Sequence, residues 1–150
     1  MAIIYVDADA CPVKDEVLRV AARHKLKVIY VSNQWMRGLD TPISEQIVVE
    51  NKPDAADDWI AERAEAGDIV ITADIPLASR SLEKQANVLN HTGKPFTEDS
   101  IGMALAMRNL MTDLREAGTA STYNAAFTKA DRSRFLNALE AAAQAAKRAL

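Results

Sequence analysis

Five aspartates in this sequence stand where they could act together on a phosphate group. Each follows a short apolar run or opens a predicted helix; they are Asp7, Asp9, Asp57, Asp58 and Asp74. Clustered carboxylates raise one another's pKa, so such a cluster is usually compensated by a cation. Mg²⁺ and Mn²⁺ prefer oxygen ligands and often bridge carboxylates and substrate phosphates. The pattern therefore predicts a site where Mg²⁺ or Mn²⁺ activates water for attack on phosphorus.

Several of these acids also have a purely structural interpretation. Asp54 is most simply a helix cap, and an acid in the next turn would favour the helix dipole. Asp74 could cap a later helix, and either Thr97 or Asp99 could cap the one after it. Capping does not explain two acids spaced by one alanine after an apolar strand, as in residues 7–9. We expect catalytic roles for Asp7, Asp9, Asp57, Asp58 and Asp74. The expected metal ligands are Asp7, Asp9, Asp58, Asp74 and Asp99.

The elements that must position these acids alternate between strands and helices. Short apolar strands are expected at residues 2–6, 27–31, 46–49, 69–72 and 87–89. Helices are expected at residues 12–22, 54–66, 76–85, 100–116 and from 128 onward. Such alternation implies a parallel sheet covered on both faces. The sequence therefore predicts a single doubly wound α/β domain over residues 1–150, with five mainly parallel strands and C-terminal helices.

This topology would bring the separated acids together. In open parallel sheets, ligands bind beyond the carboxyl ends of the strands, where the strand order reverses. If the first and fourth strands are central neighbours, Asp7, Asp9 and Asp74 meet at that edge. The start of the helix after the third strand would lie nearby. The segment 32–44 departs from the pattern, because it is a loop of about a dozen residues where a crossover helix is usual.

Length and composition set the class of protein. The chain has 150 residues, of which 49% are hydrophobic and 26% charged, as in folded globular proteins. The net charge of −3 excludes a protein coated with basic charge, but not a local groove for nucleic acid. No run approaches the roughly 18 apolar residues of a membrane helix, and the first residues lack the basic start of a signal peptide. We therefore expect a cytoplasmic bacterial protein with no membrane partner.

Three motifs resemble a known family. They are IIYVDADACPVK at residues 3–14, KPDAADDWI at residues 52–60 and ITADIPLASRSL at residues 71–82. Together they resemble the YaiI/YqxD family of bacterial proteins over nearly the whole chain. That family is similar to the PIN-like nuclease superfamily, α/β domains that bind magnesium or manganese through acidic residues and cut RNA. The PIN-like pattern implies acids at Asp7, at Asp57 or Asp58, and at Asp74, with Asp99 a looser match.

Two other functions fit parts of the sequence. Asp7-Ala8-Asp9 after an apolar strand also resembles the first motif of haloacid-dehalogenase-like phosphatases, which implies Asp7 as a covalent nucleophile. Val31-Ser32 mimics the second motif of that family, but Cys11 stands where threonine or valine is usual. The third interpretation is a non-catalytic metal- or RNA-binding module, because fold alone does not decide function.

Contacts to a nucleic-acid substrate can also be assigned. Trp35 and Arg37 in the long loop could stack on unpaired bases. The cations expected to contact phosphates are Lys14, Arg80, Lys84 and Lys94. The other notable side chains have structural interpretations: Trp59 and Cys11 as packed residues, His24 as a solvated helix residue and His91 as a loop residue.

Overall fold

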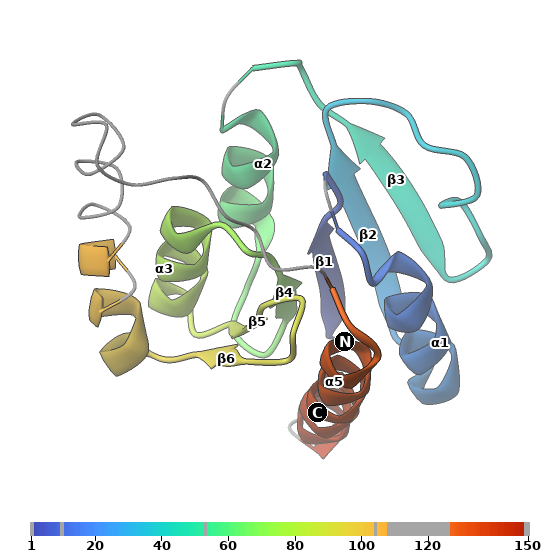
Figure 1. The fold of residues 1–150 in the computed structure, drawn as a ribbon. Coiled ribbons are helices and arrows are strands. Elements are labelled where there is room, and N and C mark those ends of the chain that lie inside the picture. Colours follow the sequence, from blue (N-terminus) through green and yellow to red (C-terminus); the bar gives the residue numbers. More distant parts are fainter. Residues whose placement is uncertain (1, 10, 53, 104, 108–126, 149–150) are drawn as a thin grey trace.

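The computed structural model describes residues 2–9, 11–52, 54–103, 105–107 and 127–148 and contains one six-stranded sheet. The strands are β1 (Ile3–Asp7), β2 (Lys27–Ser32), β3 (Ser44–Val48), β4 (Ile69–Ile71), β5 (Asn87–Leu89) and β6 (Pro95–Phe96). Their order is β3-β2-β1-β4-β5-β6 (Figure 1). The first five are parallel, and β6 pairs antiparallel with β5. The predicted doubly wound, mainly parallel sheet is thus confirmed, with one strand more than expected.

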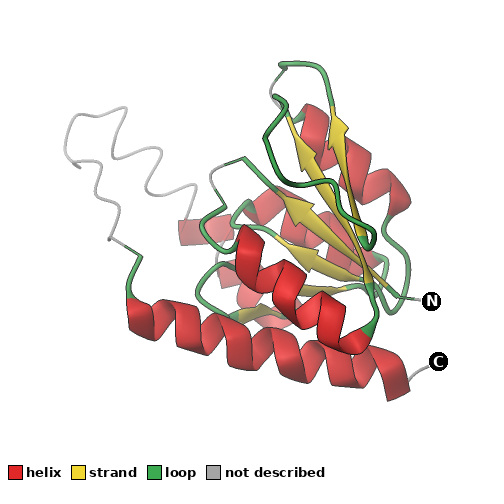
Figure 2. Cartoon of the chain, turned by 90° about the vertical axis from the view of Figure 1, so that its right-hand side faces the viewer, coloured by secondary structure: helices red, strands yellow, loops and turns green. Residues whose placement is uncertain are grey.

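Helices cover both faces of the sheet. They are α1 (Lys14–His24), α2 (Ala55–Arg63), α3 (Ile75–Glu83) and α5 (Lys129–Arg148). Figures 1 and 2 show α1 and α5 together on one face, with α2 and α3 on the other. Residues 98–103 and 105–107 are also helical, and the rest of the helix expected at 100–116 lies outside the described residues. Among the described helices, none combines the length and apolar character needed to cross a bilayer.

The central strands β1, β2 and β4 are buried on both faces, which is why they read as continuous apolar runs. In β1, Val6 packs into the cluster beneath α1 and α5, together with the fully buried Phe135 and Leu139. The preceding residue, Tyr5, packs into the opposite cluster with Ile60. Successive side chains of a strand point to opposite faces, so one short strand contributes to two cores. The two cores fix β1 in the centre of the molecule.

Helix α5 is held against α1 by charged contacts as well as apolar ones. Glu16 is buried and pairs with Arg132 at 3.2 Å. The His24 imidazole lies 2.8 Å from the Glu140 carboxylate and its side chain is only 9% exposed. The expectation of a solvated His24 was therefore wrong, because α5 covers that end of α1. Cys11 is buried as expected, and burial raises the pKa of its thiol to about 11.

Trp59 lies at the edge of the second core. It is partly exposed, not fully packed as expected. Its ring contacts Tyr5 edge-on, with centroids 6.2 Å apart, and the Arg63 guanidinium lies 4.0 Å from its centroid. These contacts cover one side of the indole. The His91 prediction is confirmed: this residue lies in the turn between β5 and β6.

Candidate functional site at the strand-order reversal

The strand order reverses between β1 and β4, which are neighbours in the centre of the sheet. Ile4 to Val6 pair with Ile69 to Ile71, so both strands end at the same edge. From this edge the chain leaves β1 toward α1 on one face and leaves β4 toward α3 on the other. The divergence opens the crevice where ligands bind in such sheets. The expected adjacency of the ends of the first and fourth strands is confirmed.

An acidic pocket of about 210 Å³ occupies this crevice. It is lined by Asp7, Asp9, Asn33, Lys52, Asp54, Ala56, Asp57 and Asp74. Five carboxylates therefore share one small volume with a single lysine. Four of the five aspartates expected to be catalytic are among them, and Asp58 is not. Asp54, Asn33 and Lys52 are additions that the sequence analysis did not assign to the site.

Thr72 connects the acids of the two central strands. Its hydroxyl donates to Asp7 Oδ2 at 3.0 Å and accepts the backbone N–H of Asp74 at 2.9 Å. The Thr72 side chain is fully buried, so these are its available partners. The bond fixes the orientation of the Asp7 carboxylate relative to Asp74. The signal for this role in the sequence was the position of Thr72 directly after an apolar strand and two residues before an aspartate.

Asp74 has two roles at once. Its Oδ1 accepts the backbone N–H of Leu77 at 2.8 Å, which makes it the N-cap of α3 as expected. The same carboxylate lines the acidic pocket. The structural and the functional interpretations of Asp74 are therefore compatible, because a cap needs only one of the two carboxylate oxygens.

Asp9 and Asn33 link the ends of β1 and β2. The backbone N–H of Asn33 donates to Asp9 Oδ2 at 3.0 Å and lies 3.4 Å from Oδ1. Within the described part of the chain, the Asn33 side-chain oxygen is buried without a hydrogen-bond partner. A buried acceptor without a donor is unfavourable, so a water or a cation at this position would satisfy it. Asn33 also lines the acidic pocket, so its amide is a neutral group among the carboxylates.

The first turn of α2 separates two adjacent aspartates. Asp57 lines the pocket, whereas Asp58 is exposed and its carboxylate lies 2.6 Å from Arg80 Nη1. Successive residues of a helix point about 100° apart, so only one of an adjacent pair can face a given site. Of the two residues that the sequence left open, the structure brings Asp57 to the other acids. Arg80, expected to contact phosphate, is paired with Asp58 outside the pocket.

Asp54 differs from its expected role as a helix cap. It precedes α2, but its side chain makes no capping hydrogen bond and its φ is 70°, in the left-handed region. A non-glycine residue in this region is uncommon, although aspartate tolerates it better than most residues. This conformation accompanies a carboxylate that lines the pocket. The cap interpretation was wrong because the backbone geometry at Asp54 is not that of a capping residue.

The remaining predicted residues lie outside the pocket. Thr97, not Asp99, caps the helix that begins at residue 98: its hydroxyl accepts the backbone N–H of Ser100 at 3.1 Å. Asp99 is exposed in the first turn of that helix. Lys14 Nζ donates to the Cys11 carbonyl at 2.7 Å. The other predicted substrate contacts, Trp35, Arg37 and Lys94, are exposed on the loops after β2 and β5.

The crowding of carboxylates changes their acidity. Burial raises the pKa of Asp7 to about 6; the charges of Asp74 and Asp9 add to the shift, and the Thr72 hydrogen bond opposes it. Burial raises the pKa of Asp57 to about 7, with further contributions from Asp74, Asp7 and Asp54. These shifts mean that the metal-free pocket disfavours negative charge. A cation would relieve the same repulsion.

The donors in the pocket fit a hard cation, although the ions themselves stay a prediction. The side chains in the pocket lining that could bind a metal ion offer carboxylate and amide oxygens, and the Lys52 ammonium has no lone pair to offer. Oxygen-only sets of this kind suit Mg²⁺ or Mn²⁺, which keep several waters and need only one or two carboxylates. Across the part of the chain that the structure describes, no three histidine, cysteine, aspartate or glutamate side chains are already arranged as a metal-binding group.

Asp57 should make the stability of the metal-free protein depend on pH. Its pKa is raised from 3.8 to about 7 on folding, so between these values the folded chain holds a proton that the unfolded chain has released. The contribution of Asp57 to stability therefore falls as pH rises through this window. In chelator, the free energy of unfolding of Asp57→Asn minus that of wild type should therefore be about 1–2 kcal/mol larger at pH 8 than at pH 5.

Urea denaturation at the two pH values measures this difference. Asp58→Asn is the matched control, because the Asp58 carboxylate is exposed and lies outside the pocket. A difference between wild type and Asp57→Asn that does not change with pH would contradict the crowding of charge described above.

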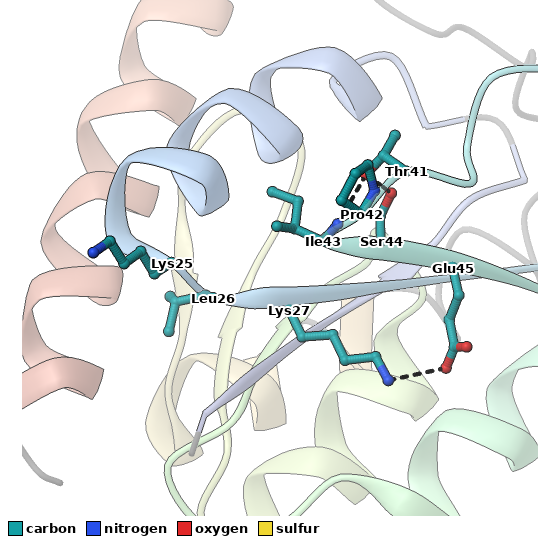
Figure 3. Close-up of a pocket in the computed structure, with 8 residues that line it drawn as sticks. All are labelled: Lys25, Leu26, Lys27, Thr41, Pro42, Ile43, Ser44 and Glu45. Carbon is teal, nitrogen blue, oxygen red and sulfur yellow. Dashed lines mark hydrogen bonds and ion pairs between the residues drawn. The ribbon is translucent and has the colours of Figure 1, made fainter.

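Two larger cavities lie elsewhere. One, of about 400 Å³, is formed where the turn from α1 to β2 faces the start of β3, and there Lys27 Nζ lies 3.4 Å from Glu45 Oε1 (Figure 3). The other, of about 440 Å³, is mainly apolar and is bordered by β5, β6 and α5. Neither gathers a set of carboxylates, so the smaller acidic pocket is the better candidate for phosphate chemistry.

Comparison with known proteins places the chain in a family. A family model described as an uncharacterized YaiI/YqxD family matches residues 5–145. The chain belongs to the YaiI/YqxD family. This match confirms the resemblance carried by the three motifs, and it includes the strands and helices that form the acidic pocket.

Relatives in the YaiI/YqxD family extend over the full chain. A UPF0178 protein of Parvibaculum lavamentivorans is 62% identical over 148 residues, covering 99% of this chain and 97% of the relative. Others are the UPF0178 proteins of Rhodospirillum rubrum, 57% identical over 97% of each chain, and of Gluconobacter oxydans, 57% identical over 91% of this chain and 78% of the relative. No solved structure gives a significant match.

Proposed function

We propose that this YaiI/YqxD protein is a divalent-metal-dependent phosphodiesterase that acts on RNA or another nucleic acid. The observation that carries the proposal is the convergence of Asp7, Asp9, Asp57 and Asp74 in one pocket at the strand-order reversal. The resemblance of the sequence motifs to PIN-like nucleases points to the same assignment. The names of the relatives give no activity, so the proposal rests on the site.

The chain supplies the ligands and their supports. Asp7, Asp9, Asp57 and Asp74 would hold Mg²⁺ or Mn²⁺, with the Asn33 amide oxygen as a neutral neighbour. When bound, such an ion orients and activates a water for attack on phosphorus. Support comes from Thr72, which orients Asp7, and from the Asn33 backbone, which orients Asp9.

The cations near the pocket differ in how directly they would contact a substrate phosphate. Lys52 is the lysine that lines the pocket; it lies 2.8 Å from Glu50, and both side chains are 72% exposed. An exposed pair of this kind is weak, so Lys52 is free to exchange Glu50 for a substrate phosphate. Lys14 and Lys94 would contact phosphates farther along a strand of nucleic acid. Arg80 would first have to leave Asp58.

The function is tested by offering two substrate classes to the protein in manganese and in chelator. Release of shorter products from single-stranded RNA, only with metal, supports the phosphodiesterase. Release of phosphate from a small phosphomonoester, with a trapped aspartyl-phosphate at Asp7, would instead establish the phosphatase. Binding of RNA without turnover of either substrate would establish a non-catalytic module.

Adjacent aspartates of α2 provide a matched pair of variants for the same assay. Asp57→Asn removes a carboxylate from the pocket, whereas Asp58→Asn removes one that pairs with Arg80 outside it. Because Asp57 would be a direct metal ligand, we expect cleavage by Asp57→Asn to fall more than about 100-fold, and cleavage by Asp58→Asn to stay within about twofold of wild type. Equal loss in both variants would contradict the geometry of the site.

A further inference from the structure

An exposed tryptophan follows the acidic-pocket residue Asn33 by two positions in the loop after β2. Trp35 is 65% exposed, the highest exposure of any aromatic side chain in the described part of the chain. Trp35 follows Asn33, a pocket residue, by two positions, so their Cα atoms are at most about 7 Å apart. Exposure of so large an apolar ring is unfavourable unless a ligand covers it.

The backbone on either side of this ring is held in place. Met36 is packed against the core beneath α1, so the loop is anchored at the residue after Trp35. The Ser32 hydroxyl donates to the Gln34 carbonyl at 2.7 Å and fixes the residue before it. Trp35 therefore projects from an anchored loop.

The Gln46 side chain on β3 makes two hydrogen bonds to the backbone of this loop. Its Oε1 accepts the Met36 N–H at 2.6 Å, and its Nε2 donates to the Met36 carbonyl at 2.8 Å. The carboxamide thus satisfies both polar groups of one backbone residue, as a neighbouring strand would. Loss of this side chain would leave the Trp35 segment without its two-point support.

The outer edge of β3 is arranged to receive the loop. The Gln46 N–H donates to Asp40 Oδ1 at 3.1 Å, and Thr41 and Ser44 exchange two backbone hydrogen bonds. Figure 1 shows the loop between β2 and β3 running along this edge. An edge strand normally leaves such groups free to pair with another chain. Here the backbone N–H and the side-chain carboxamide of Gln46 instead bind the loop that carries Trp35.

We propose that the Trp35 loop is a preformed stacking site for a nucleobase and that Gln46 is the residue that positions it. The proposal rests on the phosphodiesterase function and adds the way in which a substrate strand is held: one base lies on the Trp35 ring while its phosphates reach the acidic pocket. A planar ring on a fixed backbone binds a base with little loss of conformational freedom. Arg37 is exposed on the same loop and would be the cation nearest in sequence to the stacked base.

The test measures binding in chelator, so that no strand is cut. The chain has two tryptophans, so Trp59→Phe leaves Trp35 as the sole reporter. A short single-stranded oligonucleotide should quench Trp35 fluorescence, and an abasic strand of the same length should not. Trp35→Ala should weaken binding of the base-bearing strand about 5- to 100-fold and leave binding of the abasic strand unchanged.

Gln46→Leu tests the positioning role. It should weaken binding of the base-bearing strand roughly threefold to tenfold, again without effect on the abasic strand, and Trp35 should gain a fast component in its fluorescence anisotropy decay. Gln34→Ala, on the same loop, is the control, because no described hydrogen bond involves its side chain. Equal affinity of wild type for the two strands, or of Gln46→Leu and wild type for the base-bearing strand, would overturn the proposal.

The experiments can reject the stacking site and the phosphodiesterase function independently of each other. Base-dependent binding that needs Trp35 and Gln46, without cleavage under any condition, would support the stacking site and reject the phosphodiesterase. Metal-dependent cleavage by Trp35→Ala and Gln46→Leu with unchanged KM and kcat would overturn the stacking site and keep the phosphodiesterase.

Discussion

Asp7→Asn is expected to reduce metal-dependent cleavage of RNA more than 100-fold while leaving the chain folded. Residues that only support a metal ligand typically change affinity or activity by about 10- to 100-fold, so a direct ligand should exceed that range. Thr72→Val, which removes the hydroxyl bonded to Asp7, should fall within it. Asn can still accept this hydrogen bond, and its neutral side chain relieves the repulsion that raises the pKa of Asp7. Initial rates at saturating manganese measure both variants.

The same variant should separate metal binding from folding. A ligand that binds only the folded state stabilises it by roughly 2.7 kcal/mol at a hundred times its dissociation constant. For a domain of this length that is a rise of about 5–10 °C in melting temperature. Wild type and Asp58→Asn should show the rise with manganese, and Asp7→Asn should show less. In chelator, Asp7→Asn should melt at the same temperature as wild type or slightly higher.

Melting curves in chelator and in millimolar manganese test whether the metal binds in the acidic pocket. If manganese leaves the melting temperature of wild type unchanged, the acidic pocket does not bind the metal. An equal rise in wild type and Asp7→Asn would place the metal elsewhere.

Gly93→Ala is expected to destabilise the protein far more than a substitution at any aspartate of the acidic pocket. Gly93 has a φ of +85°, and an added Cβ would lie 2.5 Å from the Arg134 carbonyl oxygen and 2.8 Å from the Phe135 nitrogen. Both contacts are backbone atoms of α5, and Phe135 is fully buried, so α5 would have to move. We expect a loss of at least about 3 kcal/mol, or a fall of roughly 6–12 °C in melting temperature.

Gly67→Ala is the matched control for this effect. Gly67 has a similar φ of +88°, but an added Cβ would meet no atom within 4 Å. Its substitution should therefore cost only the left-handed backbone term, about 1–2 kcal/mol. Equal losses in the two variants, measured by urea denaturation, would show that the contact with α5 contributes nothing.

The order of elements follows from local patterns in the sequence. Alternation of apolar runs with helical stripes predicts the parallel sheet, because strands buried on both faces read as continuous apolar runs. That Asp7 and Asp74 end neighbouring strands was also predictable, since ligand sites of such sheets lie at the strand-order reversal. The start of the last helix near residue 128 was predictable as well; there the Thr128 and Asp131 side chains each accept the other's backbone N–H. Among the strands that the structure describes, β6 is the one that was missed, because two residues that include a proline show no hydrophobic periodicity.

The composition of the site depended on tertiary packing. Adjacent aspartates in a helix are alike in sequence, and the way α2 docks on the sheet decides that Asp57, not Asp58, joins Asp7. Thr72 and Asn33 enter the site through hydrogen bonds to residues 65 and 24 positions away. The sequence by itself determined which strands end in acids. The tertiary structure decided which side chains share the pocket, because helix rotation and strand register are set by contacts between distant parts of the chain.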